Sequence, residues 1–244
     1  MTEPRPGAVI WKGLTADERH GSLPGILVVL TFVAGIVDAL SILRLDHVFV
    51  ANITGNIIFI GLALVGARGF SVAAPLIVFA SFLAGAAAAG TVTPRPLTHR
   101  GRAAHAAVLV QLVDLAFATG MFAANDHPGT AMRNALLVVI ALGMGAKSAL
   151  VRAINVPGLT TSVFTTTLTA LAADGVRGDW RTPGFAVRVI AALALGIGAV
   201  AGAVLALKTY AWCSCALATA VLLVSVPWAN AVARSRAPWT APAA

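Results

Sequence analysis

Apolar residues follow one another along this chain in eight long runs separated by short polar stretches. The runs cover residues 23–43, 48–67, 72–91, 104–124, 134–151, 156–173, 185–207 and 211–231. An α-helix needs about 20 apolar residues to cross a hydrocarbon core ~30 Å thick, and most of the runs are close to that length. The pattern predicts an all-α polytopic membrane protein.

Two of the eight runs, 48–67 and 156–173, differ from the rest. The first opens V-F-V-A-N-I-T-G-N and the second V-P-G-L-T-T-S-V-F-T-T-T, so both begin with polar and β-branched residues. Early Gly or Pro in such a run indicates an extended entry followed by a half-helix, which is a re-entrant segment. We therefore predict six transmembrane helices plus two re-entrant or broken half-helix segments, with eight full crossings as the alternative.

The positions of arginine and lysine favour six crossings. Cytoplasmic loops carry an excess of these residues. With six crossings and a cytoplasmic start, the most basic loop, 92–103, lies inside the cell; eight crossings from the same start place it outside. This predicts that both termini are cytoplasmic, with a cytoplasmic tail at 1–22 and a flexible C-terminal tail at 232–244.

The chain also contains a weak internal repeat. A shift of 110 residues places A-G-I-V-D-A-L (34–40) on M-G-A-K-S-A-L (144–150). The single transmembrane domain, 23–231, then divides into halves of about 23–125 and 131–231. With six crossings the halves start on opposite sides of the membrane, which predicts a two-fold inverted repeat, an architecture of transporters.

Composition and charge exclude most other classes. Of the residues, 59% are hydrophobic and 11% are charged, whereas soluble domains carry about 25% charged residues. The net charge of +8 is explained by topology and indicates no nucleic-acid partner. No spacing typical of a metal site, cofactor or hydrolase occurs. We therefore expect no enzyme activity, no catalytic residue, no metal and no cofactor.

The N-I-T-G-N box is the most informative motif. A re-entrant half-helix places free N–H groups and a positive dipole end near the middle of the membrane, which favours an anion or a polar solute. The alternative is that these residues only cap broken helices. The predicted binding residues are Asn52, Thr54, Gly55 and Asn56 from the first half, Thr161, Thr165, Thr166 and Thr167 from the second, and Asp38.

Three charged residues fall deep within the apolar runs. Intramembrane charges are costly and usually face a cavity or a partner. Asp38 and Asp114 are candidate proton-coupling groups, with structural hydrogen bonding as the alternative for each. Lys147 either extends to the cytoplasmic interface or pairs with one of these acids.

The stretches F-V-A-G-I-V-D-A-L-S, H-V-F-V-A-N-I-T-G-N-I-I-F-I-G-L-A, G-M-G-A-K-S-A-L-V-R and V-P-G-L-T-T-S-V-F-T-T-T-L-T carry a resemblance to a known family. The chain resembles the YoaK family of bacterial integral membrane proteins of unknown function over most of residues 25–228. The resemblance implies a multi-pass inner-membrane protein and gives no substrate.

We therefore expect a transporter-like or channel-like membrane protein for a small polar or anionic solute bound between two half-helix N-termini. The alternative is a non-transporting membrane scaffold or sensor. The partners predicted are the lipid bilayer and the solute, and the small-residue helix faces are also compatible with a homo-oligomer.

Overall fold

The protein is described by a computed structural model in which residues 13–17, 19–92, 99–156, 169, 172 and 183–241 are placed. These residues form an all-helical bundle, and six of its helices are long and apolar enough to cross a membrane, as predicted. They are α2 (Leu23–Arg44), α4 (Ala73–Val92), α5 (Arg100–Ala124), α6 (Thr130–Ile154), α8 (Pro183–Lys208) and α9 (Ala211–Arg234).

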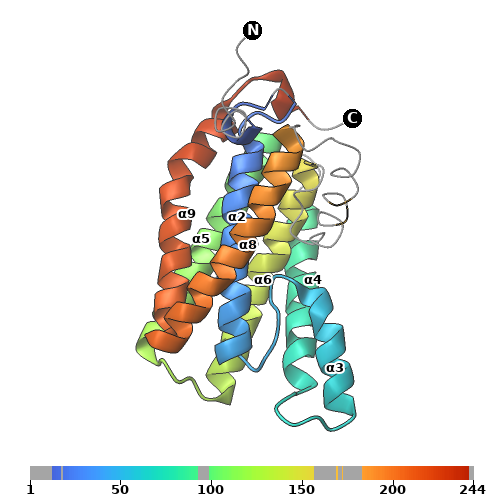
Figure 1. Ribbon diagram of the computed structural model, residues 1–244, viewed down its shortest axis with the longest axis vertical. Helices are drawn as coiled ribbons and strands as arrows, with labels where there is room; N and C mark the ends of the chain where they lie inside the picture. Colours follow the sequence, from blue (N-terminus) through green and yellow to red (C-terminus); the bar gives the residue numbers. More distant parts are fainter. Residues whose placement is uncertain are drawn as a thin grey trace.

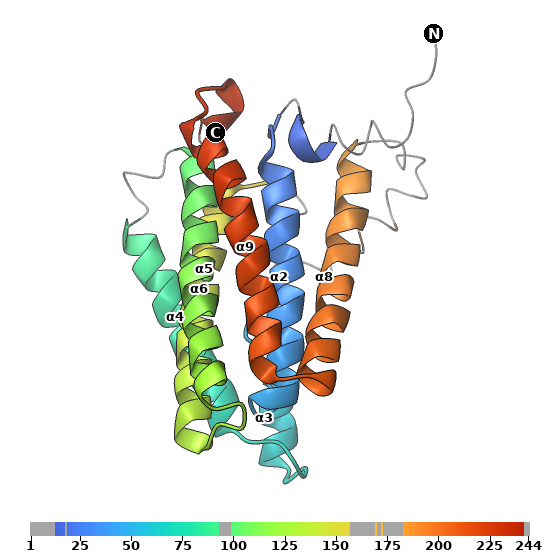
Figure 2. The ribbon, with the colours of Figure 1, turned by 90° about the vertical axis from the view of Figure 1, so that its left-hand side faces the viewer.

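The six helices alternate in direction along the bundle (Figures 1 and 2). Helices α2, α5 and α8 run away from the upper end of Figure 1, and α4, α6 and α9 return to it. The start of α2 and the end of α9 therefore lie at the same end. In chain order, α2, α4 and α5 of the first half correspond to α6, α8 and α9 of the second half. Each helix runs in the direction opposite to that of its counterpart.

Close backbone contacts at glycines hold the helices in pairs, α2 with α8 and α4 with α6. A Cβ at Gly35 would collide with the backbone of Leu195, and one at Gly145 with that of Phe82. In the reverse direction, Gly198 lies against Phe32 and Gly85 lies against Leu142. Small residues at helix interfaces permit this approach in membranes. The α2–α8 pair and the α6–α4 pair thus make the same kind of contact, in which a glycine of each helix lies against the backbone of its partner.

The outer surface of the bundle is apolar. Val113, Val200 and Val224 are each more than 60% exposed, while the fully buried residues gather between the helices. A soluble protein rarely exposes contiguous apolar surface of this kind. These faces are the ones that contact the lipid bilayer.

A buried arginine at the upper end joins four separate parts of the chain. The guanidinium of Arg100 donates to the carbonyls of Ile154 at 2.7 Å and Trp239 at 3.1 Å, and its Nη2 lies 2.9 Å from Nδ1 of His20. Trp239 also packs against Gly21, where no side chain would fit. Residues 235–241, which the sequence predicts to be part of a flexible tail, therefore contact the bundle through a short helix, η3 (Pro238–Thr240).

The lower end is held by ion pairs between loops and helix ends. Arg44 lies 3.7 Å from Asp126 and also donates to the carbonyl of Ala206, while Arg133 lies 3.1 Å from Asp46. Two arginines at this end thus have an acid beside them. By contrast, Asp17 is the only acid among the described residues at the upper end.

The glycine contacts give a matched test on one helix. Gly198 and Gly196 both lie in α8, but a Cβ at Gly198 meets the α2 backbone whereas one at Gly196 meets nothing within 4 Å. We expect Gly198→Val to destabilise the bundle by about 1–3 kcal/mol, because overpacking forces backbones apart. Gly196→Val should leave thermal unfolding in detergent close to that of the wild type. Equal melting temperatures for the two variants would contradict the contact.

The Arg100 junction predicts a pH dependence of stability. Burial lowers the pKa of His20 below its ordinary value of 6.5, and the charges of Arg100 and Arg19 act in the same direction, against the opposing effect of Asp17. The guanidinium of Arg100 can only donate, so Nδ1 of His20 must carry no proton if it is to accept this hydrogen bond. The folded state therefore binds this proton less readily than the unfolded state, so the stabilisation is complete above pH ~6.5 and is lost as the pH falls below it.

Thermal unfolding measured between pH 8 and pH 5 checks this expectation. His20→Gln retains an acceptor without a titrating group, so the fall in melting temperature below pH ~6.5 should become shallower in this variant. An unchanged pH profile would show that His20 does not contribute to it.

Candidate functional site

A short helix lies beside the lower end of the bundle, next to α4 (Figure 1). After α2 the chain rises beside the bundle, turns, and descends again as η1 (Ile53–Gly55) and α3 (Asn56–Leu64) (Figure 1). Helix α4 then starts from the same lower end at which α2 stops. A helix occupies the later residues of the first odd run, and its first residue, Asn56, is fully buried.

The chain reverses directly after α2 because two residues adopt left-handed backbone. Asp46 and His47 have φ angles of 61° and 57°, a region that Asp and His enter more readily than most residues. Ser41 holds the returning segment in place, since its hydroxyl donates to the carbonyl of Val48 at 2.7 Å. This places the segment beside the last turns of α2.

The carboxylate of Asp38 then binds the returning segment. Its Oδ1 accepts the N–H groups of Val50 at 2.9 Å and Ala51 at 2.7 Å. Its Oδ2 accepts the N–H of Asn52 at 3.2 Å and the side-chain amide of Asn52 at 2.6 Å. Asp38 is only 5% exposed. Non-helical backbone inside a membrane must find such partners, and one carboxylate provides four hydrogen bonds to it.

Asn56 closes the other side of the same loop. Its Oδ1 accepts the N–H of Phe49 at 2.8 Å, and its Nδ2 donates to the Phe49 carbonyl at 2.7 Å. The Phe49 ring stacks on Phe59 of α3 with centroids 5.5 Å apart. Gly55 is required here because any Cβ would meet that ring at 2.6 Å. Both Asn56 and Gly55 are therefore explained by the shape of the loop.

Asn52 and Thr54 differ from the other residues of the box. Thr54 is exposed and Asn52 is half-buried, and both belong to the turn that leads into α3. The N–H groups of Gly55 and Asn56 already donate to the carbonyls of Asn52 and Ile53 in this turn. The free polar atoms of the Asn52 and Thr54 side chains are available to a ligand. The predicted partners from the second half, Thr161, Thr165, Thr166 and Thr167, lie outside the described residues.

Lys147 lies in the centre of the bundle. It is 0% exposed, so it does not extend to the interface, which was one of the two expectations for it. The carboxylate of Asp38 is close enough to act on the Lys147 ammonium electrostatically. The structure thus connects three features from distant parts of the sequence: the start of the half-helix, the acid that holds it and a buried cation.

Asp114 forms a second polar position. It is 7% exposed, its Oδ2 has no hydrogen-bond partner, and it rests against Gly143 of α6, where a side chain would collide with it. Gln111, one turn earlier on α5, donates to the sulfur of Met144 at 3.4 Å and leaves its Oε1 without a partner. Gly143 precedes Lys147 by one helical turn on α6, so Asp114 lies against the same helix that carries the buried lysine.

Two residues of these sites were not identified from the sequence. Ser41 follows Asp38 by three residues, which places both on one face of α2, and this spacing is a signal that could have been used. Arg100 stands at the start of an apolar run, where arginine ordinarily anchors a helix at the interface. Its burial follows from chain segments that meet only in the folded protein.

Comparison with known proteins agrees with this architecture. The sequence matches a family described as "Protein of unknown function (DUF1275)" over residues 26–227. The chain belongs to the DUF1275 family. It is also 28% identical over 157 residues to the "UPF0700 transmembrane protein YoaK" of Bacillus subtilis (strain 168), a match that covers 61% of this chain and 65% of the relative. No solved structure matches the chain.

This DUF1275 protein is therefore a multi-pass membrane protein of an uncharacterised family. The matched relative is bacterial and is named a transmembrane protein. The resemblance to the YoaK family inferred from the sequence is confirmed. The match to the relative spans slightly less than two thirds of that protein's length.

The role of Asp38 can be tested against an acid nearby in the chain. In Asp38→Asn, one acceptor oxygen becomes an NH₂ group that faces other donors, and we expect a loss of about 1–3 kcal/mol in the stability of the loop. Since 1.4 kcal/mol corresponds to a factor of ten, amide exchange at Val50 to Asn52 should accelerate about tenfold or more.

Asp46→Asn is the matched control, because Asp46 lies in the turn at the lower end and Asn tolerates its left-handed backbone. Hydrogen exchange followed by mass spectrometry should show protection of residues 48–56 unchanged in this variant. Equal protection in Asp38→Asn and the wild type would rule out the carboxylate as the element that holds the loop.

Proposed function

We propose that this protein is a transporter or channel for a small anion or polar solute, which binds at the start of the half-helix. The observation that carries the proposal is the fully buried Lys147, within electrostatic range of the acid that holds that half-helix in place. A helix N-terminus and a buried ammonium both favour negative charge. Asn52 and Thr54 supply further polar atoms.

The charge balance supports an anion over a cation. The Asp38 carboxylate is compensated by four N–H donors from the loop. The Lys147 ammonium and the Asp38 carboxylate carry opposite unit charges, and the start of the half-helix adds a partial positive charge of roughly half an elementary charge. A small anion reduces the excess of positive charge that results. A cation would add to it in a region from which water is largely excluded.

The exchanged glycine contacts support a two-fold inverted repeat. Gly35 and Gly145, related by the 110-residue shift, make equivalent contacts with α8 and α4, and the corresponding helices run in opposite directions. Inverted repeats with half-helices at matching positions are typical of transporters with a site near the midplane. The path of residues 45–64 likewise supports a re-entrant segment.

We further propose that the upper end of the bundle faces the cytoplasm of a bacterium, at its inner membrane. Arginines 102, 152, 188, 234 and 236 belong to helix ends or turns at this end. At the lower end Arg44 and Arg133 are each paired with an acid. This asymmetry follows the positive-inside rule, and both termini would then be cytoplasmic.

Asp114 is the proposed coupling residue. A buried carboxylate oxygen without a hydrogen bond is costly in hydrocarbon, and binding of a proton removes the cost. Asp114 makes no hydrogen bond to the loop through its Oδ2, and it rests on Gly143, one turn before Lys147 on α6. The proposal has no catalytic step and requires no metal or cofactor.

The purified, full-length protein tests the anion site directly. Thermal unfolding is measured with sodium chloride, nitrate, acetate and phosphate against sodium gluconate at equal ionic strength. An anion at 100 times its dissociation constant should stabilise the wild type by about 2.7 kcal/mol. This stabilisation should disappear in Lys147→Gln and persist in Lys208→Gln, which removes an exposed lysine at the end of α8. The stabilising anion is then used for flux measurements in liposomes.

A different result favours the second candidate, a scaffold or sensor that does not transport. Asp38 and Asn56 are both occupied by hydrogen bonds within the loop, which is the observation that supports it. Stabilisation that is equal in Lys147→Gln and Lys208→Gln would contradict the proposed site. Binding without anion flux in liposomes would favour a sensor.

A further inference from the structure

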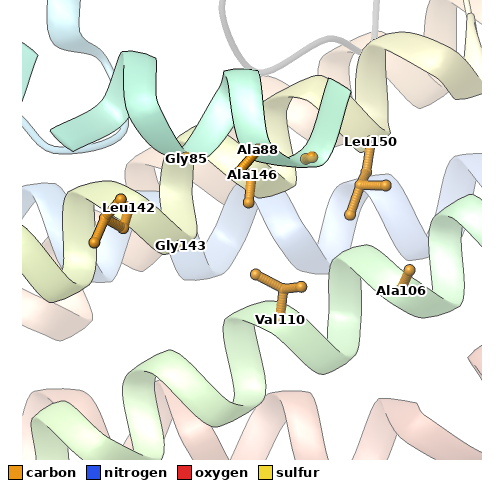
Figure 3. Close-up of a pocket in the computed structure, with 9 residues that line it drawn as sticks. Gly85, Ala88, Ala106, Val110, Leu142, Gly143, Ala146 and Leu150 are labelled. Carbon is orange, nitrogen blue, oxygen red and sulfur yellow. The ribbon is translucent and has the colours of Figure 1, made fainter. Parts of the chain in front are cut away.

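An apolar groove opens on the side of the bundle between α4, α5 and α6, in the half nearer the upper end. Its volume is about 500 Å³, within the ~300–1,000 Å³ typical of ligand pockets. Figure 3 shows Ala106 and Val110 of α5 facing α4 and α6 across this space. The groove is lined by Gly85, Ala88, Ala89, Ala106, Val110, Leu142, Gly143, Ala146 and Leu150.

The groove results from a difference between the two halves. In the second half, α8 packs against α9 as well as against α2. In the first half, α4 packs closely on α6 through Gly85 and Gly145 but forms no comparable interface with α5 among the described residues. The alanines on the facing surfaces are too short to fill the gap between α4 and α5. Atoms that line an empty space lose dispersion contacts, so an occupant would be stabilising.

The surroundings of the groove specify a hydrocarbon occupant. Its lining is made of glycine, alanine, valine and leucine, and it opens sideways on a surface that faces lipid. Asp114 and its unpartnered oxygen lie against Gly143 and are not part of the lining. A polar solute would find no hydrogen bonds along these walls, whereas an acyl chain needs none.

A cation lies at the upper end of the same α5 face. Arg102, Ala106 and Val110 follow one another at four-residue spacing, so they share one face of the helix. Arg102 is exposed and close to the start of the membrane-spanning helix. From Arg102 to Val110 the helix rises by about 12 Å, slightly less than one leaflet of a core ~30 Å thick. A phosphate at Arg102 therefore places an attached acyl chain along the groove.

We propose that the groove between α4, α5 and α6 binds one acyl chain of an anionic phospholipid whose phosphate contacts Arg102. The upper end as a whole carries an excess of arginine over acid among the residues described, and basic positions at this depth attract anionic lipid headgroups. The proposal is independent of whether the protein transports a solute, because the groove and the half-helix occupy different parts of the bundle.

The test uses the full-length protein in a neutral detergent with either phosphatidylglycerol or phosphatidylcholine added. Native mass spectrometry counts the bound lipids, and a titration gives the affinity of the tightest one. We expect phosphatidylglycerol to bind at least about tenfold more tightly than phosphatidylcholine. Arg102→Gln should remove most of this preference, and Arg68→Gln, an exposed arginine at the lower end, should retain it.

A second pair of variants tests the groove itself. Ala88→Phe places a ring in the groove and should weaken the tightest phosphatidylglycerol site about tenfold or more. Ala87→Phe adds the same ring to an exposed position of α4 outside the lining and should not weaken it. Equal binding of both lipids, or unchanged binding in Ala88→Phe, would overturn the proposal. A wild-type dimer that Ala88→Phe converts to monomer would instead assign the groove to a second copy of the chain.

Discussion

The carboxylate of Asp38 holds a non-helical segment, residues 48–52, against the transmembrane helix α2. Residues 48–52 have no helical hydrogen-bond ladder, and in hydrocarbon each unpaired backbone group would cost several kcal/mol. Asp38 accepts three backbone N–H groups and one amide from this segment, and Ser41 and Asn56 satisfy further groups. Because these contacts fix the loop, the half-helix α3 starts inside the molecule with its N-terminus beside the bundle core.

The functional and structural interpretations of the N-I-T-G-N box are therefore compatible. Asn56 and Gly55 shape the loop, whereas Thr54 and part of Asn52 remain accessible at the helix start. A structural acid that binds the loop also places its negative charge near Lys147 and so contributes to the stability of a cation in the bundle centre. The same group can both maintain the fold and adjust the charge of a binding site.

The two halves of the bundle are alike in their tightest contacts and unlike elsewhere. Glycines bring α2 against α8 and α4 against α6 in equivalent ways, yet α9 contacts α8 while α5 leaves α4 largely uncovered. Backbone contacts at glycine tolerate little change, because any added atom would collide with the neighbouring helix. Contacts between larger side chains are more easily altered. The halves can therefore differ where side chains meet and agree where backbones meet.

The amino-acid sequence alone determined the class of the protein, the six long helices and the position of the broken run, because apolar length and early polar residues are local properties. It also located Asp38, Asn56 and Lys147 as unusual residues. It could not show that Asp38 binds residues 50–52, that Lys147 is fully buried near it, or that Arg100 joins His20, Ile154 and Trp239. Those relations depend on segments up to 139 positions apart, and they are fixed by how the helices pack against one another rather than by any local pattern of residues.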